Sequence, residues 1–330
     1  MSCIVVFSIY FATELLPFPG QHSALPAATS ENPSSSGVTQ IRRAITILSK
    51  SLETQTWGST VQTTASNMLQ PSSGTQTKGL TLPTRASRIV ETNKMRRFIE
   101  HFHVKITEKE RYSFKTLLEI FMKTVPSDIR YFLYSGSLLG SYRHHGMIPW
   151  DDDLDLVVQG TDARRLVTSL SKLGPHFIVS QDGTYRWKFY HRKASKIRWY
   201  SWKWPSIDIS FYRENRTHVR DSDPAFPRYA FKRSDVFPLG KRPFMGLLVP
   251  TPRNTEAVIL QNYNISVCVN THYDHRLEKF VPRDKWTTLP CDLLKAMYPF
   301  VRREYSPNGT LEVLERNNTR IGEYFIKQRD

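Results

Sequence analysis

The chain has 330 residues, of which 39% are hydrophobic and 12% aromatic, so it can bury a sizeable core in one or two domains. Its formal net charge of +16 indicates an anionic partner, which is a nucleic acid, a membrane surface, a nucleotide or a phosphorylated glycan. Its three cysteines form no C-x-x-C pair and no cysteine-based zinc site, and Cys268 and Cys291 form either one disulfide or two buried thiols.

Residues 1–20 contain an apolar run, Cys3–Ala12, which is followed by Glu14 and Pro17. The run is shorter than the roughly 20 apolar residues of a membrane-spanning helix. It has the length of a signal-peptide core, but no Lys or Arg precedes it. We therefore expect either a signal segment or a truncated membrane anchor here.

Four N-x-S/T sequons favour the secretory route, namely those at Asn215, Asn264, Asn308 and Asn317. We therefore expect the protein in the Golgi or ER lumen. If the first segment is an anchor, it is a single-pass type II membrane protein.

Residues 21–94 are rich in Ser, Thr, Gln and Pro, as in "ENPSSSGVTQ". This composition offers little to bury, so we predict a disordered stalk, with a short helix around "QIRRAITILSKSLE". Residues 95–300 have the pattern of a globular domain. The signal fades beyond Pro290, and residues 301–330 are predicted to be a polar C-terminal tail.

The globular domain begins with a helix over residues 107–125. Thr107 and Glu110 have the spacing of a capping box, apolar residues follow at helical spacing, and Pro126 ends the pattern. Further along the chain, the pattern predicts strands at 129–136, 150–158, 176–181, 184–192 and 204–213, helices at 137–145 and 161–173, and a strand, a turn and a helix within 243–264. This order predicts an α+β (mixed α/β) fold.

The stretch "WDDDLDL" places four carboxylates, those of Asp151, Asp152, Asp153 and Asp155, within five positions. Side chains alternate between the two faces of a strand, so Asp153 and Asp155 would share a face with Asp151, while Asp152 points away. Two carboxylates at i and i+2 suit a shared Mg²⁺ or Mn²⁺, which would also relieve their repulsion. The alternative is a solvated turn, which the flanking Leu, Val and Trp residues disfavour.

Two other positions complete this pattern. Asp208 lies inside the apolar strand "SIDISFY", where a lone carboxylate is unfavourable unless it is paired or bound to a metal. Gly136 and Ser137 lie between a strand and a helix, where backbone N–H groups form a phosphate cradle. A strand pair with three carboxylates is the arrangement that holds metal ions for phosphate chemistry.

These residues resemble a known family. "YFLYSGSLLGSYRHHGMIPWDDDLDLVV" is similar to the LicD family, which includes the fukutin and fukutin-related proteins, within the DNA polymerase β-like nucleotidyltransferase superfamily. The superfamily pattern of Gly-Ser, Asp-x-Asp and a third carboxylate matches Gly136-Ser137, Asp153-x-Asp155 and Asp208. The resemblance is close over residues 107–160 and weaker to about residue 265. It implies a nucleotidyltransferase-like mixed β-sheet flanked by helices.

The resemblance also implies a reaction. A phosphorylated alcohol, such as phosphocholine or ribitol phosphate, would pass from a CDP-linked donor to a glycan acceptor. Asp153, Asp155 and Asp208 would be the metal ligands and catalytic residues. The chain lacks the cysteine-rich zinc-binding insertion of fukutin-related protein, so no zinc is expected.

Basic residues are candidates for binding the donor. Arg143 either clamps a donor phosphate or is a surface residue at a helix end, and His144 is a second candidate. Lys241 lies either in the donor groove or in a solvated loop. The segment 184–204 interleaves Lys and Arg with aromatic residues, which suits both a core strand and a groove for the donor and acceptor.

Two other functions use the same residues. A nucleotidyltransferase acting on nucleic acid would share the carboxylates and explain the positive charge. A non-catalytic glycan-binding protein would retain the fold, but it would have no reason to keep costly carboxylates. The sequons and the LicD-like motif favour the glycan-directed phosphotransferase, with a nucleotide-activated donor and a glycan acceptor as partners in preference to nucleic acid. The sequence does not specify the oligomeric state.

Overall fold

The computed structural model describes residues 95–327, so the predicted apolar segment and stalk lie outside the described residues. Residues 95–100 are helical and belong to a separate compact unit. The described residues from Phe102 onward form the unit that carries the acidic motif. Within the described part of the chain, no helix is both long and apolar enough to cross a membrane.

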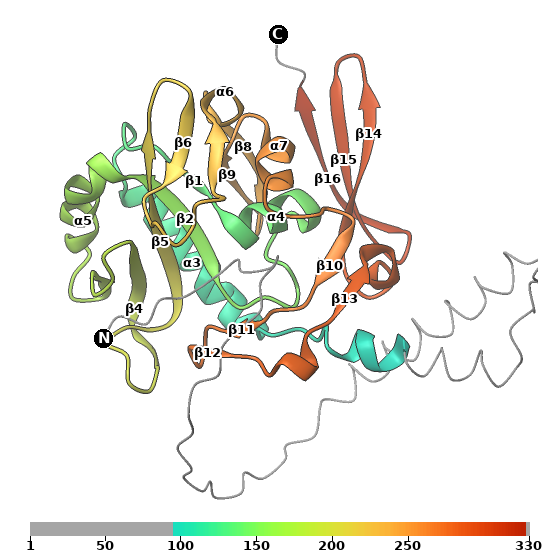
Figure 1. Ribbon diagram of the computed structural model, residues 1–330, viewed down its shortest axis with the longest axis horizontal. Coiled ribbons are helices and arrows are strands. Elements are labelled where there is room, and N and C mark those ends of the chain that lie inside the picture. Colours follow the sequence, from blue (N-terminus) through green and yellow to red (C-terminus); the bar gives the residue numbers. More distant parts are fainter. Residues whose placement is uncertain (1–94, 328–330) are drawn as a thin grey trace, which may run out of the picture. The chain divides into compact units, whose positions relative to one another are not determined.

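The unit has the mixed α+β fold that the sequence predicts (Figure 1). Its helices are α3 (Glu108–Thr124), α4 (Ser135–His144), α5 (Ala163–Ser171), α6 (Arg233–Val236) and α7 (Thr255–Leu260). Its first nine strands are β1 (Tyr131–Leu133), β2 (Leu154–Gln159), β3 (Phe177–Ser180), β4 (Arg186–Lys196), β5 (Lys203–Glu214), β6 (His218–Asp221), β7 (Ala230–Lys232), β8 (Gly240–Phe244) and β9 (Leu247–Thr251). The remaining strands are β10 (Val267–Val269), β11 (Tyr273–Asp274), β12 (Lys279–Phe280), β13 (Thr288–Pro290), β14 (Phe300–Ser306), β15 (Gly309–Arg316) and β16 (Thr319–Lys327).

Seven strands form the central sheet. Its main path is β1-β2-β5-β4-β3, with β6 added beside β5 and β7 beside β6. β2 and β5 are parallel, whereas the other pairs are antiparallel. Because β2 and β5 run in the same direction, residues near their starts lie at the same edge of the sheet.

Helix α3 covers one face of this sheet. The predicted capping box is confirmed, since the Thr107 hydroxyl accepts a hydrogen bond from the Glu110 N–H and the Glu110 carboxylate accepts one from the Thr107 N–H. The Phe121 ring on the buried face of α3 contacts the ring of Phe189 in β4. Phe189 is the register partner of Ile207 in β5. Residues that alternate with these apolar side chains therefore project from the face opposite α3.

A three-stranded antiparallel sheet, β14-β15-β16, occupies residues 300–327, where the sequence analysis expects a polar tail. Turns at Pro307-Asn308 and Asn317-Asn318 join its strands, and both Asn317 and Asn318 have positive φ, which suits a tight hairpin turn. Glu312 is fully buried and attaches the sheet to β8 through Arg242 and to the end of α4 through His145. Polar residues on its exposed face hide the hairpin pattern in the composition.

Cys268 and Cys291 form a disulfide between β10 and the short turn after β13. The structure thus decides between the two alternatives that the sequence leaves open. The bond closes a loop across a separation of 23 residues, and this loop contains the β11–β12 hairpin.

Candidate active site

Asp155 and Asp208 lie opposite each other on the two parallel strands. Asp155 in β2 is the register partner of Asp208 in β5, and both are half-buried on the face opposite α3. Desolvation, followed by repulsion from Asp208, raises the pKa of Asp155 to about 7. Two close carboxylates on one face of the sheet favour a bound cation.

Asp153 is buried and lies one residue before β2. The sequence analysis starts this strand at residue 150, but the structure starts it at Leu154, so strand alternation does not place Asp151, Asp152 or Asp153. Desolvation raises the pKa of Asp153 to about 7, and the charges of Asp155 and Asp208 add to this effect. The charge of Asp153 therefore interacts with the charges of Asp155 and Asp208. Asp153 lies in the segment before β2, whereas Asp155 and Asp208 lie within strands.

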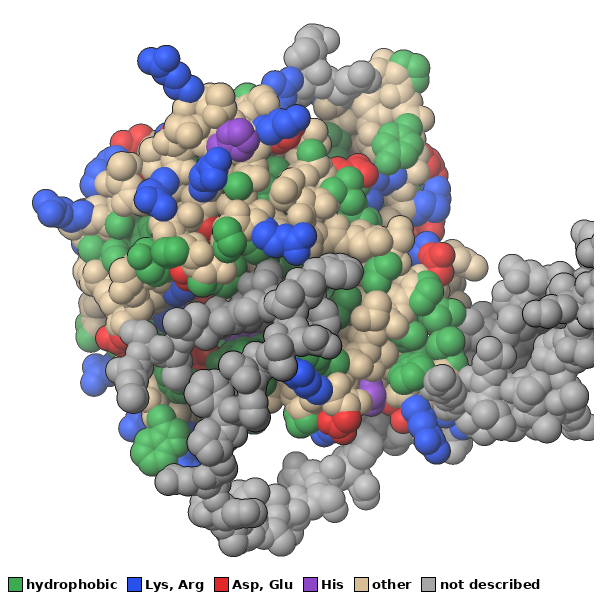
Figure 2. All heavy atoms as spheres, viewed as in Figure 1, with side chains coloured by type: hydrophobic (Ala, Val, Ile, Leu, Met, Phe, Trp, Pro, Cys, Tyr) green, Lys and Arg blue, Asp and Glu red, His purple; other side chains and the backbone are tan. Residues whose placement is uncertain are grey.

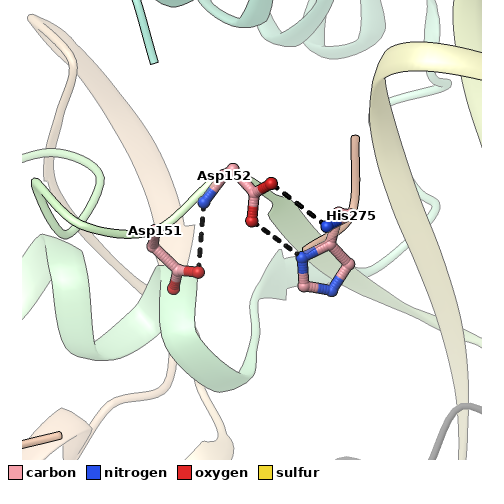
Figure 3. Close-up of side chains that lie close together, drawn as sticks. All are labelled: Asp151, Asp152 and His275. Atoms are coloured by element: carbon pink, nitrogen blue, oxygen red, sulfur yellow. Dashed lines mark hydrogen bonds and ion pairs between the residues drawn. The ribbon is translucent and has the colours of Figure 1, made fainter. Parts of the chain in front are cut away.

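We call Asp153, Asp155 and Asp208 the first cluster. Asp151, Asp152 and His275 form a second cluster (Figure 3). One ligand atom from each residue lies within 4.8 Å of the ligand atoms of the other two. Within residues 95–327, Asp153, Asp155 and Asp208 do not form such a compact group. Asp152 accepts hydrogen bonds from the backbone N–H of His275 (3.1 Å) and of Arg276 (3.3 Å), and its Oδ1 lies 3.1 Å from Nδ1 of His275.

His275 makes ion pairs at this second cluster. Burial opposes protonation of the imidazole, but Asp153 and Asp152 outweigh it and raise the pKa of His275 to about 10. A protonated imidazole donates from both nitrogens. Its Nε2 lies 3.4 Å from Oδ2 of Asp153, so the imidazolium bridges Asp152 and Asp153 as an ion pair.

Gly136 and Ser137 lie in the first turn of α4, as the motif predicts. The Ser137 hydroxyl accepts a hydrogen bond from the backbone N–H of Asp155 (2.9 Å), which ties the helix start to β2. A Cβ at Gly136 would lie 3.1 Å from Oδ2 of Asp151, so glycine leaves room for that carboxylate. The N-cap residue, Tyr134, makes no side-chain hydrogen bond to the first backbone N–H groups of α4. These N–H groups are the ones that bind anions at a helix start.

Lys188 in β4 is the register partner of Asp208, and its Nζ lies 2.7 Å from Oδ2 of that residue. The same Nζ lies 3.3 Å from Oε1 of Glu278, which is buried. Glu278 also accepts hydrogen bonds from the indole N–H of Trp202 and the hydroxyl of Tyr273. Although burial opposes it, the charges of Asp208 and Glu278 raise the pKa of Lys188, which therefore stays charged.

Arg143 and His144 face the interior. The Arg143 guanidinium donates to His144 Nε2, to the Val267 carbonyl and to Cys291 Sγ, while His144 Nδ1 lies 2.6 Å from the Pro299 carbonyl. The expectation that these two side chains bind a donor phosphate gains no support from these contacts, because their polar atoms are used within the protein. Their role in donor binding stays a prediction.

Lys241 lies exposed on β8, in a two-stranded sheet separate from the one that carries Asp155 and Asp208. Its neighbour Arg242 is the buried member of the pair and binds Glu312. Lysine and arginine side chains are spread over the face seen in Figure 2, with acidic side chains between them. The positive charge of the protein is thus not confined to one predicted residue, and the assignment of Lys241 to the donor site stays a prediction.

No sequence pattern identifies His275, Glu278 or Lys188 as functional residues. Lys188 stands in the basic and aromatic segment 184–204, where no spacing distinguishes it from its neighbours. His275 and Glu278 lie in a polar stretch without a periodic pattern. The four aspartates within residues 151–155 do indicate that partners exist, since buried carboxylates require cations. They do not indicate which residues those partners are.

The donor atoms of the first cluster suit a hard divalent cation. Asp153, Asp155 and Asp208 offer only carboxylate oxygens, which Mg²⁺ and Mn²⁺ prefer. Burial first, and then the neighbouring carboxylates, raise the pKa values of Asp153 and Asp155, and a divalent cation there would favour their ionised forms. The residues therefore fit such an ion.

Comparisons with known proteins are consistent with this geometry. Residues 128–254 match the model of the LicD/FKTN/FKRP nucleotidyltransferase domain. An uncharacterised protein of Rickettsia typhi is 27% identical over 210 residues, which cover 59% of this chain and 62% of that protein. The ribitol 5-phosphate transferases FKRP of Mus musculus and Homo sapiens are each 26% identical over 152 residues, which cover 44% of this chain and 30% of theirs. The chain thus spans less than two thirds of the length of these relatives.

Proposed function

We propose that the chain is a glycan-modifying phosphotransferase, since residues 128–254 match the model of the LicD/FKTN/FKRP nucleotidyltransferase domain. It transfers a phosphorylated alcohol from a CDP-linked donor to a hydroxyl group of a glycan. The observation that carries the proposal is the pairing of Asp155 with Asp208 on parallel strands, next to Asp153 and the start of α4.

Each part of the site has a task in this proposal. Asp153, Asp155 and Asp208 hold a Mg²⁺ or Mn²⁺ ion. The ion would neutralise the diphosphate and the charge that develops during transfer. The first turn of α4, at Gly136 and Ser137, binds phosphate oxygens through backbone N–H groups.

Two features support a secretory location. The Cys268–Cys291 disulfide is typical of proteins that mature in an oxidising compartment. Sequons also lie on exposed residues, such as Asn264. We propose the lumen of the ER or Golgi as the place of the reaction, with a glycan of that pathway as acceptor and the N-terminal segment as a signal or an anchor.

A screen of CDP-linked alcohols with release of CMP as the readout tests the activity. We expect release that requires Mg²⁺ or Mn²⁺ and falls at least about 100-fold in Asp155→Asn and Asp208→Asn, because charge neutralisation at the phosphates supplies most of the rate enhancement. Asp128→Asn is the matched control, since Asp128 is an exposed carboxylate paired with Arg165, and it should leave the rate unchanged.

Three outcomes contradict the proposal. The first is the absence of CMP release with every donor, and the second is equal activity in Asp155→Asn and Asp128→Asn. Nucleotide addition to an oligonucleotide, with binding that weakens steeply with salt, would instead assign the site to nucleic acid.

A further inference from the structure

The loop closed by the Cys268–Cys291 disulfide lies outside the family-matched residues 128–254, yet it contacts the acidic cluster. Two buried side chains of the matched domain hold its base. Arg143 donates to the Val267 carbonyl and to Cys291 Sγ, and the Trp150 indole donates to the Val269 carbonyl (3.0 Å). The disulfide and these hydrogen bonds fix both ends of the loop beside the segment that precedes β2.

One side of the loop holds the acidic segment 151–153. The Thr271 hydroxyl donates to the Trp150 carbonyl and lies 3.3 Å from Oδ1 of Asp151. His275 contacts the carboxylates of Asp152 and Asp153 through its two ring nitrogens, at 3.1 and 3.4 Å. Figure 3 shows the Asp152 carboxylate directed at the backbone and ring of His275.

The other side of the loop holds Lys188. Glu278, three residues after His275, is only 6% exposed and lies 3.3 Å from Lys188 Nζ, which in turn lies 2.7 Å from Asp208. Trp202 and Tyr273 donate to the two oxygens of Glu278. A buried carboxylate with this many partners has one well-defined position, and so does the ammonium group that it holds.

We propose that the loop 268–291 is part of the active site and that His275 and Glu278 are its positioning residues. His275 fixes the position of the Asp153 carboxylate by direct contact. Glu278 fixes the position of Lys188, which in turn fixes the Asp208 carboxylate. The loop thereby fixes the positions of two carboxylates that the proposed function assigns to the divalent cation. This inference rests on the proposed function, because that function makes Asp153 and Asp208 the ligands.

The first experiment measures Mn²⁺ binding to the full chain by isothermal titration, without donor or acceptor. His275→Ala and Glu278→Gln should each weaken Mn²⁺ binding by 10- to 100-fold, the range found for residues that orient metal ligands. Leu277→Ala is the matched control, because Leu277 lies between the two on the same hairpin and is 54% exposed. It should bind Mn²⁺ like the unmodified protein.

The second experiment does not depend on a metal or on activity. Hydrogen–deuterium exchange of the peptides covering 150–156 and 186–190 should be faster in His275→Ala and Glu278→Gln respectively, and unchanged in Leu277→Ala. Mild reduction of the folded protein should speed exchange in residues 150–156 and weaken Mn²⁺ binding. A Cys268→Ser/Cys291→Ser variant should already show both changes and should not respond to the reductant.

The outcomes separate the two proposals. If Asp155→Asn abolishes Mn²⁺ binding while His275→Ala and Glu278→Gln leave both binding and exchange unchanged, the positioning role is overturned and the metal site stands. If the unmodified protein binds no Mn²⁺, the metal-dependent function fails. In that case exchange at 150–156 decides the loop proposal, and unchanged exchange in His275→Ala overturns it.

Discussion

At the scale of single residues, two of the three glycines in the motif "GSLLGSYRHHG" have different tasks. Gly136 leaves room for the carboxylate of Asp151. Gly140, in the middle of α4, faces backbone, since a Cβ there would lie 2.4 Å from the Gly146 carbonyl oxygen and 3.2 Å from the Ile148 nitrogen. The turn that leads to the aspartates therefore packs directly on the helix.

Gly140→Ala should destabilise the protein by about 1–3 kcal/mol, because backbone rather than a flexible side chain must move to admit the methyl group. The free energy of unfolding in urea measures this effect. Gly146→Ala is the control, since the nearest atom to a Cβ there is 3.8 Å away, and it should change stability far less. Equal stability of Gly140→Ala and the unmodified protein would contradict the close approach.

At the scale of elements, the β14–β16 sheet depends on one carboxylate. Glu312 in β15 is fully buried, and Arg242 of β8, Arg303 of β14 and His145 at the end of α4 contact it. Burial alone would raise the pKa of Glu312, but the hydrogen bond of His145 and the charge of Arg242 lower it to about 2. The ionised form of Glu312 therefore stabilises the fold.

The stabilisation by Glu312 should depend on pH. Its pKa is lower in the folded protein than the ordinary value of 4.5, so the contribution is complete above about pH 4.5 and is lost as the pH falls towards 2. A shift of this size corresponds to about 3 kcal/mol. Glu312→Gln should lower the free energy of unfolding by about 3–5 kcal/mol at pH 7, because it leaves buried cations unpaired, and the difference from the unmodified protein should shrink below pH 4.5.

Urea unfolding at pH 7, 4.5 and 3 measures this difference. Glu304→Gln is the control on the same sheet, because Glu304 is half-exposed and pairs with Arg302 at the surface. Its effect should stay below about 1 kcal/mol. A difference for Glu312→Gln that does not vary with pH would show that the lowered pKa is wrong.

The element scale also shows what the sequence could predict. Helix α3 was predictable because its capping box and apolar spacing are local signals. The strand that carries Asp155 begins at Leu154 and not at the predicted residue 150, because the contacts that hold residues 151–153 outside it come from His275, 123 positions after Asp152. The β14–β16 sheet was missed, since its strands carry polar residues on the exposed face and its turns have little compositional signal.

At the scale of the whole molecule, the Cys268–Cys291 disulfide links two segments of the described residues covalently. It closes the loop that carries His275 and Glu278. Loop closure lowers the entropy of the unfolded chain, so the bond should stabilise the native state as well as position these two residues.

Cys268→Ser/Cys291→Ser should lower the free energy of unfolding by about 3 kcal/mol, as expected for a loop of this size. Thermal unfolding with and without dithiothreitol checks the value. The reductant should lower the melting temperature of the unmodified protein and have no effect on the double variant. An unchanged melting temperature in the unmodified protein, with reduction verified by mass spectrometry, would contradict the assigned bond.

The sequence by itself determined the mixed α+β class, the helix before the motif and the aspartates that the proposed chemistry needs, because periodicity, caps and charge density are properties of neighbouring residues. Tertiary structure decided how those charges are neutralised. It paired Asp155 with Asp208, placed His275 against Asp153 and Glu278 against Lys188, and turned Arg143 towards the interior. A carboxylate in an apolar stretch of sequence indicates that a cationic partner is needed. The packing of distant segments determines which cation contacts it.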